Sequence, residues 1–329
     1  MTGLLEFTSG GQTPEAAFEA YRSLYARGSD VSRGPGVFHA HLRAVRLGSL
    51  ILYDRRLNGV THTRGERIAD DGFNHFAVHL VLAGRLEGSA ESGFDEARPG
   101  DLVLVDTLKP SRTTAHDLHV LTASVSRGVV AAAAGPTGRL HGHVAPAPST
   151  LVLGDVMQSL VRHGAHATAD VVPGLRRAFG EALSAALSAS APGALVEARR
   201  LDLAQRDAAA RFIEGHLQDR ALDAAMIAEG LGLSRSALYR LFQPYGGVSV
   251  YVMARRVAAV RDAVETGSTE PLSDLALRFG FTDESHLNRR FSRVYGQPVG
   301  SYRRAVAMET PDSDSGRARR FAAWMTEIE

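Results

Sequence analysis

One eight-residue pattern occurs twice in the last third of the chain, and it limits what this region can fold into more than any other feature. IAEGLGLS at 227–234 recurs as LALRFGFT at 275–282. Each copy predicts a helix, a tight turn at a glycine, an N-capping Ser or Thr, and a second helix that crosses close above the small Ala228 or Ala276. A single copy says little because two-helix hairpins are common, but two matching copies indicate a duplicated helix-turn-helix.

The second helix of each copy presents polar side chains opposite its apolar residues. Residues four apart share a helix face, so Leu287 and Phe291 mark the buried side of the later helix. A helix fits the major groove of DNA, where arginine pairs with guanine and asparagine with adenine. The expected DNA-contacting residues are Arg235, Ser236, Tyr239, Arg240, Glu284, Ser285, Asn288, Arg289, Arg290 and Arg293. For any one arginine the alternative is a solvated surface or an ion pair within the protein.

Charge is concentrated in the same region. From Gly232 to Arg304 there are eleven arginines and six acidic residues, and Lys109 is the only lysine of the chain. Guanidinium groups favour forked contacts to phosphate and guanine. We expect Arg255, Arg256, Arg303 and Arg304 to contact phosphates or to be surface charges of their helices. Residues 248–266 predict one long helix that separates the two units and sets them against successive faces of the groove.

The quoted segments resemble a known family. IAEGLGLSRSALYRLF and DLALRFGFTDESHLNRRFSRVYG are similar to the two halves of the DNA-binding domain of AraC/XylS bacterial transcription regulators. The resemblance covers about 205–304. It implies a regulator, expected to be an activator, that binds double-stranded promoter DNA, works with RNA polymerase, forms a homodimer and answers to a small-molecule effector.

The N-terminal part of the chain has a different sequence pattern. Residues 37–126 form short β-rich runs separated by Gly, Pro, Asp and Asn, which is typical of a sandwich or barrel. HLVLAGRLEG and RPGDLVLVDTLKP resemble the cupin-like, effector-binding β-barrel of the same family. Ahead of it, residues 13–27 predict an amphipathic helix.

From about 150 the chain becomes helical and rich in alanine. Leu175, Phe179, Leu183 and Leu187 recur every four residues, and this stripe suits a core or a dimer interface equally. The last segment places Phe321, Trp324, Met325 and Ile328 on one helix face. We expect an α+β chain: a cupin-like sensor at 1–150, a helical linker or dimerisation region at 151–200, a double helix-turn-helix domain at 201–305, and a tail with a short helix at 306–329.

Histidines in the sensor invite two interpretations. His39-x-His41 is the start of a metal-binding cupin motif, but Val45 and Arg46 stand where a carboxylate is needed, and no histidine follows the Pro99-Gly100 turn. We therefore expect no metal and no other cofactor. A pocket of neutral and cationic donors suits a carboxylate or phenol effector, an aromatic or aliphatic acid. The expected pocket residues, some of which could instead lie on strand surfaces, are His39, His41, Arg43, His62, His75 and His79.

Several classes of protein are disfavoured. Cysteine is absent, which excludes disulfides, thiolate metal sites and thiol catalysis. No long apolar run or signal segment is present, so a cytoplasmic protein without membrane contact is expected. A cupin enzyme would need the absent metal ligands and would leave the repeat unexplained, so we expect no enzyme. An alternative is a regulator whose N-terminal domain binds a partner protein instead of a metabolite.

Overall fold

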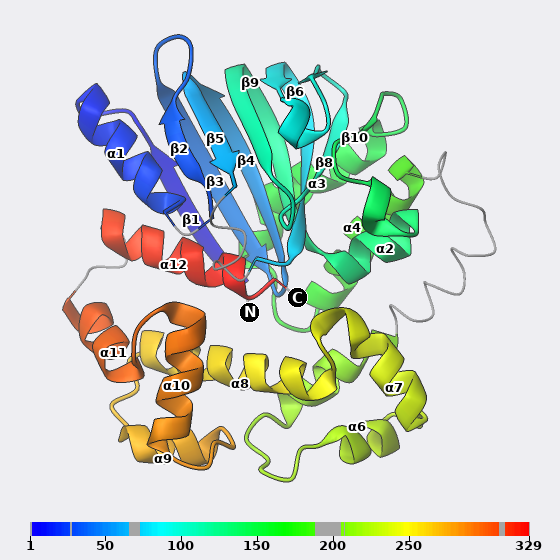
Figure 1. Ribbon diagram of the computed structural model, residues 1–329, viewed down its shortest axis with the longest axis vertical. Coiled ribbons are helices and arrows are strands. Elements are labelled where there is room, and N and C mark those ends of the chain that lie inside the picture. The colour runs from blue at the N-terminus through cyan, green and yellow to red at the C-terminus, as the bar shows by residue number, and fades with distance from the viewer. Residues whose placement is uncertain are drawn as a thin grey trace. The chain divides into compact units, whose positions relative to one another are not determined.

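The computed structural model describes residues 2–26, 28–65, 73–187, 205–206, 208–308 and 313–328 (Figure 1). The chain divides into two compact units. One contains Met1–Arg199 together with Arg317–Glu329, and the other contains Arg200–Gly316. The last residues of the chain therefore fold with the first ones, and each unit is described by itself below.

The first unit is built on one antiparallel sheet with helices on both faces. Its strands are β1 (Thr2–Thr8), β2 (Asp30–Arg33), β3 (His39–Leu47), β4 (Leu50–Asn58), β5 (Val60–Arg64), β6 (His75–Glu87), β7 (Glu96–Ala97), β8 (Leu102–Asp106), β9 (Ser111–Ser126) and β10 (His143–Ala145). Its helices are α1 (Pro14–Leu24), η2 (Ala90–Ser92), α2 (Arg127–Ala134), η3 (Thr137–Arg139), α3 (Leu151–His163), η4 (Gly164–His166), α4 (Val172–Leu187) and, at the far end of the chain, α12 (Asp314–Thr326).

The long strand β9 organises the sheet. The main strand order is β1-β3-β4-β9-β6-β8-β10, and β5 also pairs with β9 while β2 pairs with β5. Along β9, Ala115 lies opposite Val60 of β5 and Ser124 lies opposite Ile51 of β4. The expected Pro99-Gly100-Asp101 turn is present: Gly100 has a φ of +93°, and all of β8 after it is buried. The predicted α+β class with a sheet-rich N-terminal domain is confirmed.

The two faces of the sheet bury separate cores. On one face, α1 and α12 contribute Phe18, Tyr21, Leu24, Phe321 and Trp324 to a cluster with residues from β1, β3, β4 and β9. α1 begins where the sequence predicts, because the Thr13 side chain accepts a hydrogen bond from Ala16 N. The tail helix is thus an integral part of the sheet unit.

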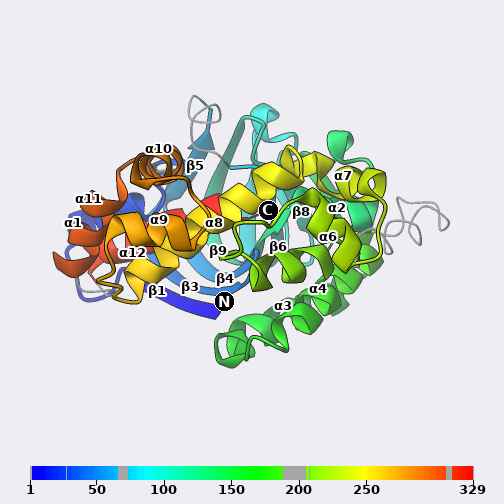
Figure 2. The ribbon, with the colours of Figure 1, turned by 90° about the horizontal axis from the view of Figure 1, so that it is seen from below.

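The other face is covered by α2, α3 and α4, of which α3 and α4 lie side by side (Figures 1 and 2). The leucine stripe of α4 packs into this core: Phe179, Leu183 and Leu187 are buried and Leu175 is half-buried. Of the two interpretations of the stripe, the described residues support the core.

The second unit consists of short helices around one long helix. They are α6 (Ala224–Gly230), α7 (Arg235–Phe242), η6 (Gln243–Tyr245), α8 (Val248–Glu265), α9 (Leu272–Arg278), α10 (Glu284–Tyr295) and α11 (Val299–Met308). The predicted spacer is present as the 18-residue helix α8. Among the helices that the structure describes, none is long and apolar enough to cross a membrane.

Both repeats fold as predicted, with one correction. Gly232 and Gly280 adopt positive φ values of 63° and 73° in the two turns, a conformation that favours glycine. Ser234 caps α7, since its Oγ accepts from Ala237 N at 3.2 Å. The cap of α10 is Asp283 and not the expected Thr282: its Oδ1 accepts from His286 N at 2.6 Å. The extra residue after the second turn moves the cap by one position.

Candidate nucleic-acid interface and ligand cavity

The outward face of α10 is set by its buried residues. Leu287, Phe291 and Tyr295 are in the core, where the Phe291 ring lies 5.4 Å from that of Tyr302. At 100° per residue, Ser285, Arg289 and Arg293 fall on the opposite side, and all three are exposed. This stripe can reach a groove without disturbing the core.

Asn288 lies at the edge of that stripe and is half-buried. Its Oδ1 accepts a hydrogen bond from Val299 N at 3.1 Å, which satisfies a free N–H at the start of α11. Its Nδ2 donates to Glu284 Oε1 at 3.5 Å. Because the carbonyl is occupied, the two-bond pairing with adenine expected for Asn288 would first require this contact to break.

The remaining predicted residues of the interface also lie on the surface. On α7, Arg235, Ser236, Tyr239 and Arg240 are exposed over buried Leu238, Leu241 and Phe242, and Tyr239 is 51% exposed. On α10, Glu284 and Arg290 are exposed, and Arg290 Nε donates to His286 Nε2 at 3.4 Å. α7 and α10 thus present comparable polar faces.

Two of the four expected phosphate contacts have structural partners instead. The guanidinium of Arg256 is buried and donates to the backbone oxygens of Leu217, Asp219 and Gly280 at 3.2, 2.7 and 3.3 Å. It fills the space that a side chain at Gly280 would occupy. Arg255 Nε pairs with Glu214. The expectation is wrong for Arg256, because its buried guanidinium satisfies backbone oxygens inside the unit; for Arg255, which is only partly buried, it stays a prediction.

The sheet unit encloses a cavity of about 120 Å³ on its α1/α12 face. Its apolar lining includes Leu24, Leu57, Leu118, Phe321 and Met325. Polar groups enter from β4, β5, β6 and β9: Arg55, His62, His75, His79 and Thr122. A small, mostly apolar cavity with a few converging polar groups is the usual form of a ligand site.

Together with Arg64, Arg55 is one of two arginines that line this cavity. Its Nη2 donates to Thr122 Oγ1 at 2.6 Å and to His79 Nδ1 at 3.2 Å, while its Nε is buried without a hydrogen-bond partner. No carboxylate among the described residues pairs with it. Arginine stays protonated in proteins, so a positive charge faces the cavity with unused donor capacity.

His62 and His79 flank Arg55 and are neutral at physiological pH. Burial and the nearby Arg55 charge lower the pKa of His62 to about 3, and the same causes hold the pKa of His79 well below its usual range. His79 Nδ1 accepts from Arg55, so the ring proton of His79 is on Nε2. Tyr21 Oη and His62 Nε2 lie 3.0 Å apart. These contacts fix the polar end of the cavity.

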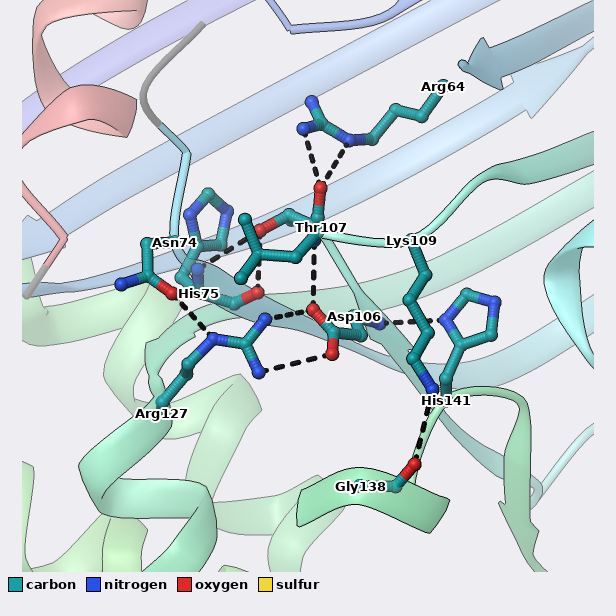
Figure 3. Close-up of polar contacts among 10 residues, drawn as sticks. Arg64, Asn74, His75, Asp106, Thr107, Lys109, Arg127, Gly138 and His141 are labelled. Atoms are coloured by element: carbon teal, nitrogen blue, oxygen red, sulfur yellow. Dashed lines mark hydrogen bonds and ion pairs between the residues drawn. The ribbon is translucent and has the colours of Figure 1, made fainter. Parts of the chain in front are cut away.

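A second polar group of the cavity is His75, whose ring is fully buried (Figure 3). Neither ring nitrogen has a partner among the described residues, and burial, Arg64 and Arg127 lower the pKa of the ring to about 3. The two arginines are engaged elsewhere. Arg64 donates to Thr107 O, and Arg127 pairs with the carboxylate of Asp106. Of the two arginines that line the cavity, Arg55 and Arg64, it is Arg55 whose buried Nε has no hydrogen-bond partner among the described residues.

Three predicted effector residues lie outside the cavity. His39 and His41 are exposed, because Ala40 and Leu42 of the same strand point into the core. Arg43 pairs with Glu6 and donates to Val161 O at 3.4 Å. His62, His75 and His79 do come together. No cluster of three or more potential metal ligands occurs among the described residues.

Sequence reasoning missed Arg55, Thr122 and the residues of α12. Tyr53, Arg55 and Leu57 alternate along β4 with period two, and Tyr53 and Leu57 are buried on the cavity side. That alternation could have placed Arg55 inward. No comparable signal in the sequence connects Phe321 or Met325 to a cavity formed by strands two hundred residues earlier.

The comparisons with known proteins concern mainly the second unit. Residues 227–305 match the family model of a helix-turn-helix domain. Over 96 residues the chain is 30% identical to the Right origin-binding protein of Escherichia coli (strain K12) and to the Transcriptional regulator Rob of Salmonella typhimurium. Each match covers 29% of this chain and spans 32% of the relative, about a third of its length.

Over 79% of its length the chain is similar in fold to a solved structure. The AraC-like transcriptional activator CuxR matches with a TM-score of 0.52 and 22% identity, over 79% of this chain and 96% of that one. A sheet unit followed by a second unit with two helix-turn-helix motifs places the chain in the class of proteins that carry a helix-turn-helix domain. Both comparisons agree with the resemblance to AraC/XylS regulators: residues 227–305 match a helix-turn-helix domain, and the fold is similar to that of an AraC-like activator.

Proposed function

We propose that this protein is a transcription regulator whose second unit binds promoter DNA and whose sheet unit binds a small organic acid. The observation that supports DNA binding best is the repeat itself. Two helices, α7 and α10, each carry an exposed arginine face over a buried leucine and phenylalanine anchor. Buried anchors with polar outward faces are what a helix needs to enter the major groove.

The separation of the two helix-turn-helix motifs by α8 favours a tandem site on DNA. α8 has 18 residues and is therefore roughly 27 Å long. Successive turns of the major groove are roughly 34 Å apart. With short helices packed at both ends of α8, a single chain is able to present two helices to adjacent major-groove segments and read an asymmetric sequence.

Binding of the full chain to a DNA duplex from upstream of its neighbouring genes tests this proposal. We expect salt-sensitive binding, because phosphate contacts release counterions, and a footprint that spans two adjacent major-groove segments. A shuffled duplex of equal length is the control. Equal affinity for both duplexes would refute sequence-specific regulation. Activation through RNA polymerase and action as a homodimer are parts of the same proposal that rest on the family resemblance.

The chemistry of the cavity supports a ring-sized carboxylate as the effector. A cavity of about 120 Å³ is near the size of an engineered 150 Å³ cavity that holds benzene in another protein. Arg55 supplies a charge that no acidic side chain of the described residues pairs with, and the neutral His79 supplies a second donor. An anion satisfies both, and charge-assisted hydrogen bonds are the stronger ones.

Benzoate is a suitable probe, with toluene as its uncharged counterpart. We expect benzoate to raise the melting temperature of the full chain and toluene to do so much less. Arg55→Met should abolish the effect of benzoate, whereas His41→Gln, an exposed change in the same unit, should preserve it. A benzoate effect that survives Arg55→Met would refute the role of Arg55.

A further inference from the structure

The C-terminal helix α12 forms one wall of the cavity. Phe321, Ala322 and Met325 line it together with strand residues from the first half of the chain. The Phe321 ring lies 5.3 Å from that of Tyr25 and 5.8 Å from that of Tyr53, and Tyr53 Oη donates to Met325 Sδ at 2.9 Å. A ligand in the cavity therefore touches the last helix of the chain as well as the sheet.

Outside the cavity, α12 is held by a small number of specific contacts. Glu327 and Arg46 form a buried ion pair with 2.7 Å between Oε2 and Nη2. The Trp324 ring covers Gly3 so closely that a Cβ there would lie 2.5 Å from it. Arg320 Nη1 donates to Leu4 O at 3.2 Å. These contacts lie on β1, β3 and the end of α12, and none of them belongs to the cavity lining.

The helix α12 also links the C-terminal end of the second unit back to the sheet unit. The DNA-binding unit, Arg200–Gly316, is joined to the sheet unit at both of its ends, by the chain before Arg200 and by α12 after it. Docking of α12 therefore restrains the second end of the DNA-binding unit. A ligand that contacts docked α12 binds the docked state more tightly than the undocked state, which is the requirement for shifting an equilibrium.

We propose that occupation of the cavity is transmitted to the DNA-binding unit through α12: the ligand stabilises the docked helix, and the docked helix restrains the DNA-binding unit at its C-terminal end. This inference rests on the proposed carboxylate site. By linkage, anything that favours docking of α12 must raise the affinity for the ligand by the same factor.

The absence of cysteine from the chain makes thiol labelling a direct test. Ala323→Cys places a thiol on the buried face of α12, where it can react only when the helix undocks. Ala133→Cys places a matched thiol in α2, in the core on the opposite face of the sheet. Trp324 is the only tryptophan, so its emission shows that α12 is docked in each full-length variant before labelling begins.

Without ligand, Ala323→Cys should label faster than Ala133→Cys, because undocking of α12 does not require the sheet unit to unfold, and benzoate at one hundred times its Kd should slow labelling of Ala323→Cys by about a hundredfold. Equal labelling rates of the two thiols without ligand, or no slowing of Ala323→Cys while the melting temperature shows that benzoate is bound, would overturn the inference and leave the ligand site intact. No change in melting temperature with benzoate would instead overturn the site, and the inference with it.

Discussion

Arg55 is charged, lines the cavity and has no acidic partner among the described residues. A charge desolvated without compensation destabilises the folded state. We expect Arg55→Met to leave the melting temperature of the ligand-free protein unchanged or to raise it, although the same variant loses benzoate binding. Thermal melts of the two proteins without ligand check this. A drop of more than a few degrees would mean that Arg55 has mainly a structural role through Thr122 and His79.

Arg289 and Asn288 are neighbours in sequence with different expected roles. Arg289→Ala should weaken specific DNA binding by roughly 1–3 kcal/mol and relax the preference at one base pair, with no change in melting temperature. Asn288→Ala should instead lower stability by about 1 kcal/mol, since it removes the partner of Val299 N. Binding to single-base variants of the site, alongside melts, separates the two. Uniform loss of affinity in Arg289→Ala would identify a phosphate contact.

At this scale, the sequence predicted exposed residues better than internal ones. The stripe of α10 follows from helix periodicity alone. His39 and His41 were misplaced because a strand has two faces and their motif, without its other ligands, does not say which face is buried. Arg256 was misassigned because net charge counts arginines without showing which of them satisfy backbone oxygens.

The N-terminus of α10 depends on Asp283. Its carboxylate accepts from His286 N, and this backbone hydrogen bond lowers the pKa of Asp283. We expect Asp283→Ala to destabilise the chain by about 1 kcal/mol, the usual effect of losing an N-cap. Asp283→Ser should recover most of it, and Thr282→Ala should cost less than Asp283→Ala. Chemical denaturation of the three variants measures these differences, and a larger effect of Thr282→Ala would return the cap to the position expected from the repeat.

Helices and turns with a strong local sequence signal were predicted correctly, but the elements against which they pack were not. Glycine turns and apolar spacing predict both helix-turn-helix units and the spacer α8. The apolar face of α12 is equally plain in the sequence, as Phe321, Trp324, Met325 and Ile328. What it packs against is a matter of long-range contacts with β1, β3 and β4, and no periodicity carries that information.

The pH dependence of stability is a property of the whole molecule. His62 and His75 have folded-state pKa values of about 3, against about 6.5 in an unfolded chain. Between these values the unfolded state binds protons that the folded state does not, so stability falls as the pH decreases below 6.5. At pH 5 each histidine should cost about 2 kcal/mol.

Denaturation between pH 7.5 and 5 checks this, with His75→Leu as the comparison. That variant should lose less stability on acidification than the parent, because one of the buried histidines that take up a proton on unfolding is gone. Parallel curves for the two proteins would show that His75 takes up its proton in both states.

The return of α12 to the sheet has a consequence for how the protein is made. Domains generally fold as they leave the ribosome, the N-terminal one first, at about 5–20 residues per second. Here the first domain needs Phe321 and Trp324, so its core stays incomplete while the entire DNA-binding unit is synthesised, a delay on the order of ten seconds. A chain that stops early has an intact helix-turn-helix unit and an unfinished sheet. Such fragments lack Phe321 and Trp324 and leave part of the apolar side of β1, β3 and β4 uncovered, which makes them better protease substrates than the chain that includes α12.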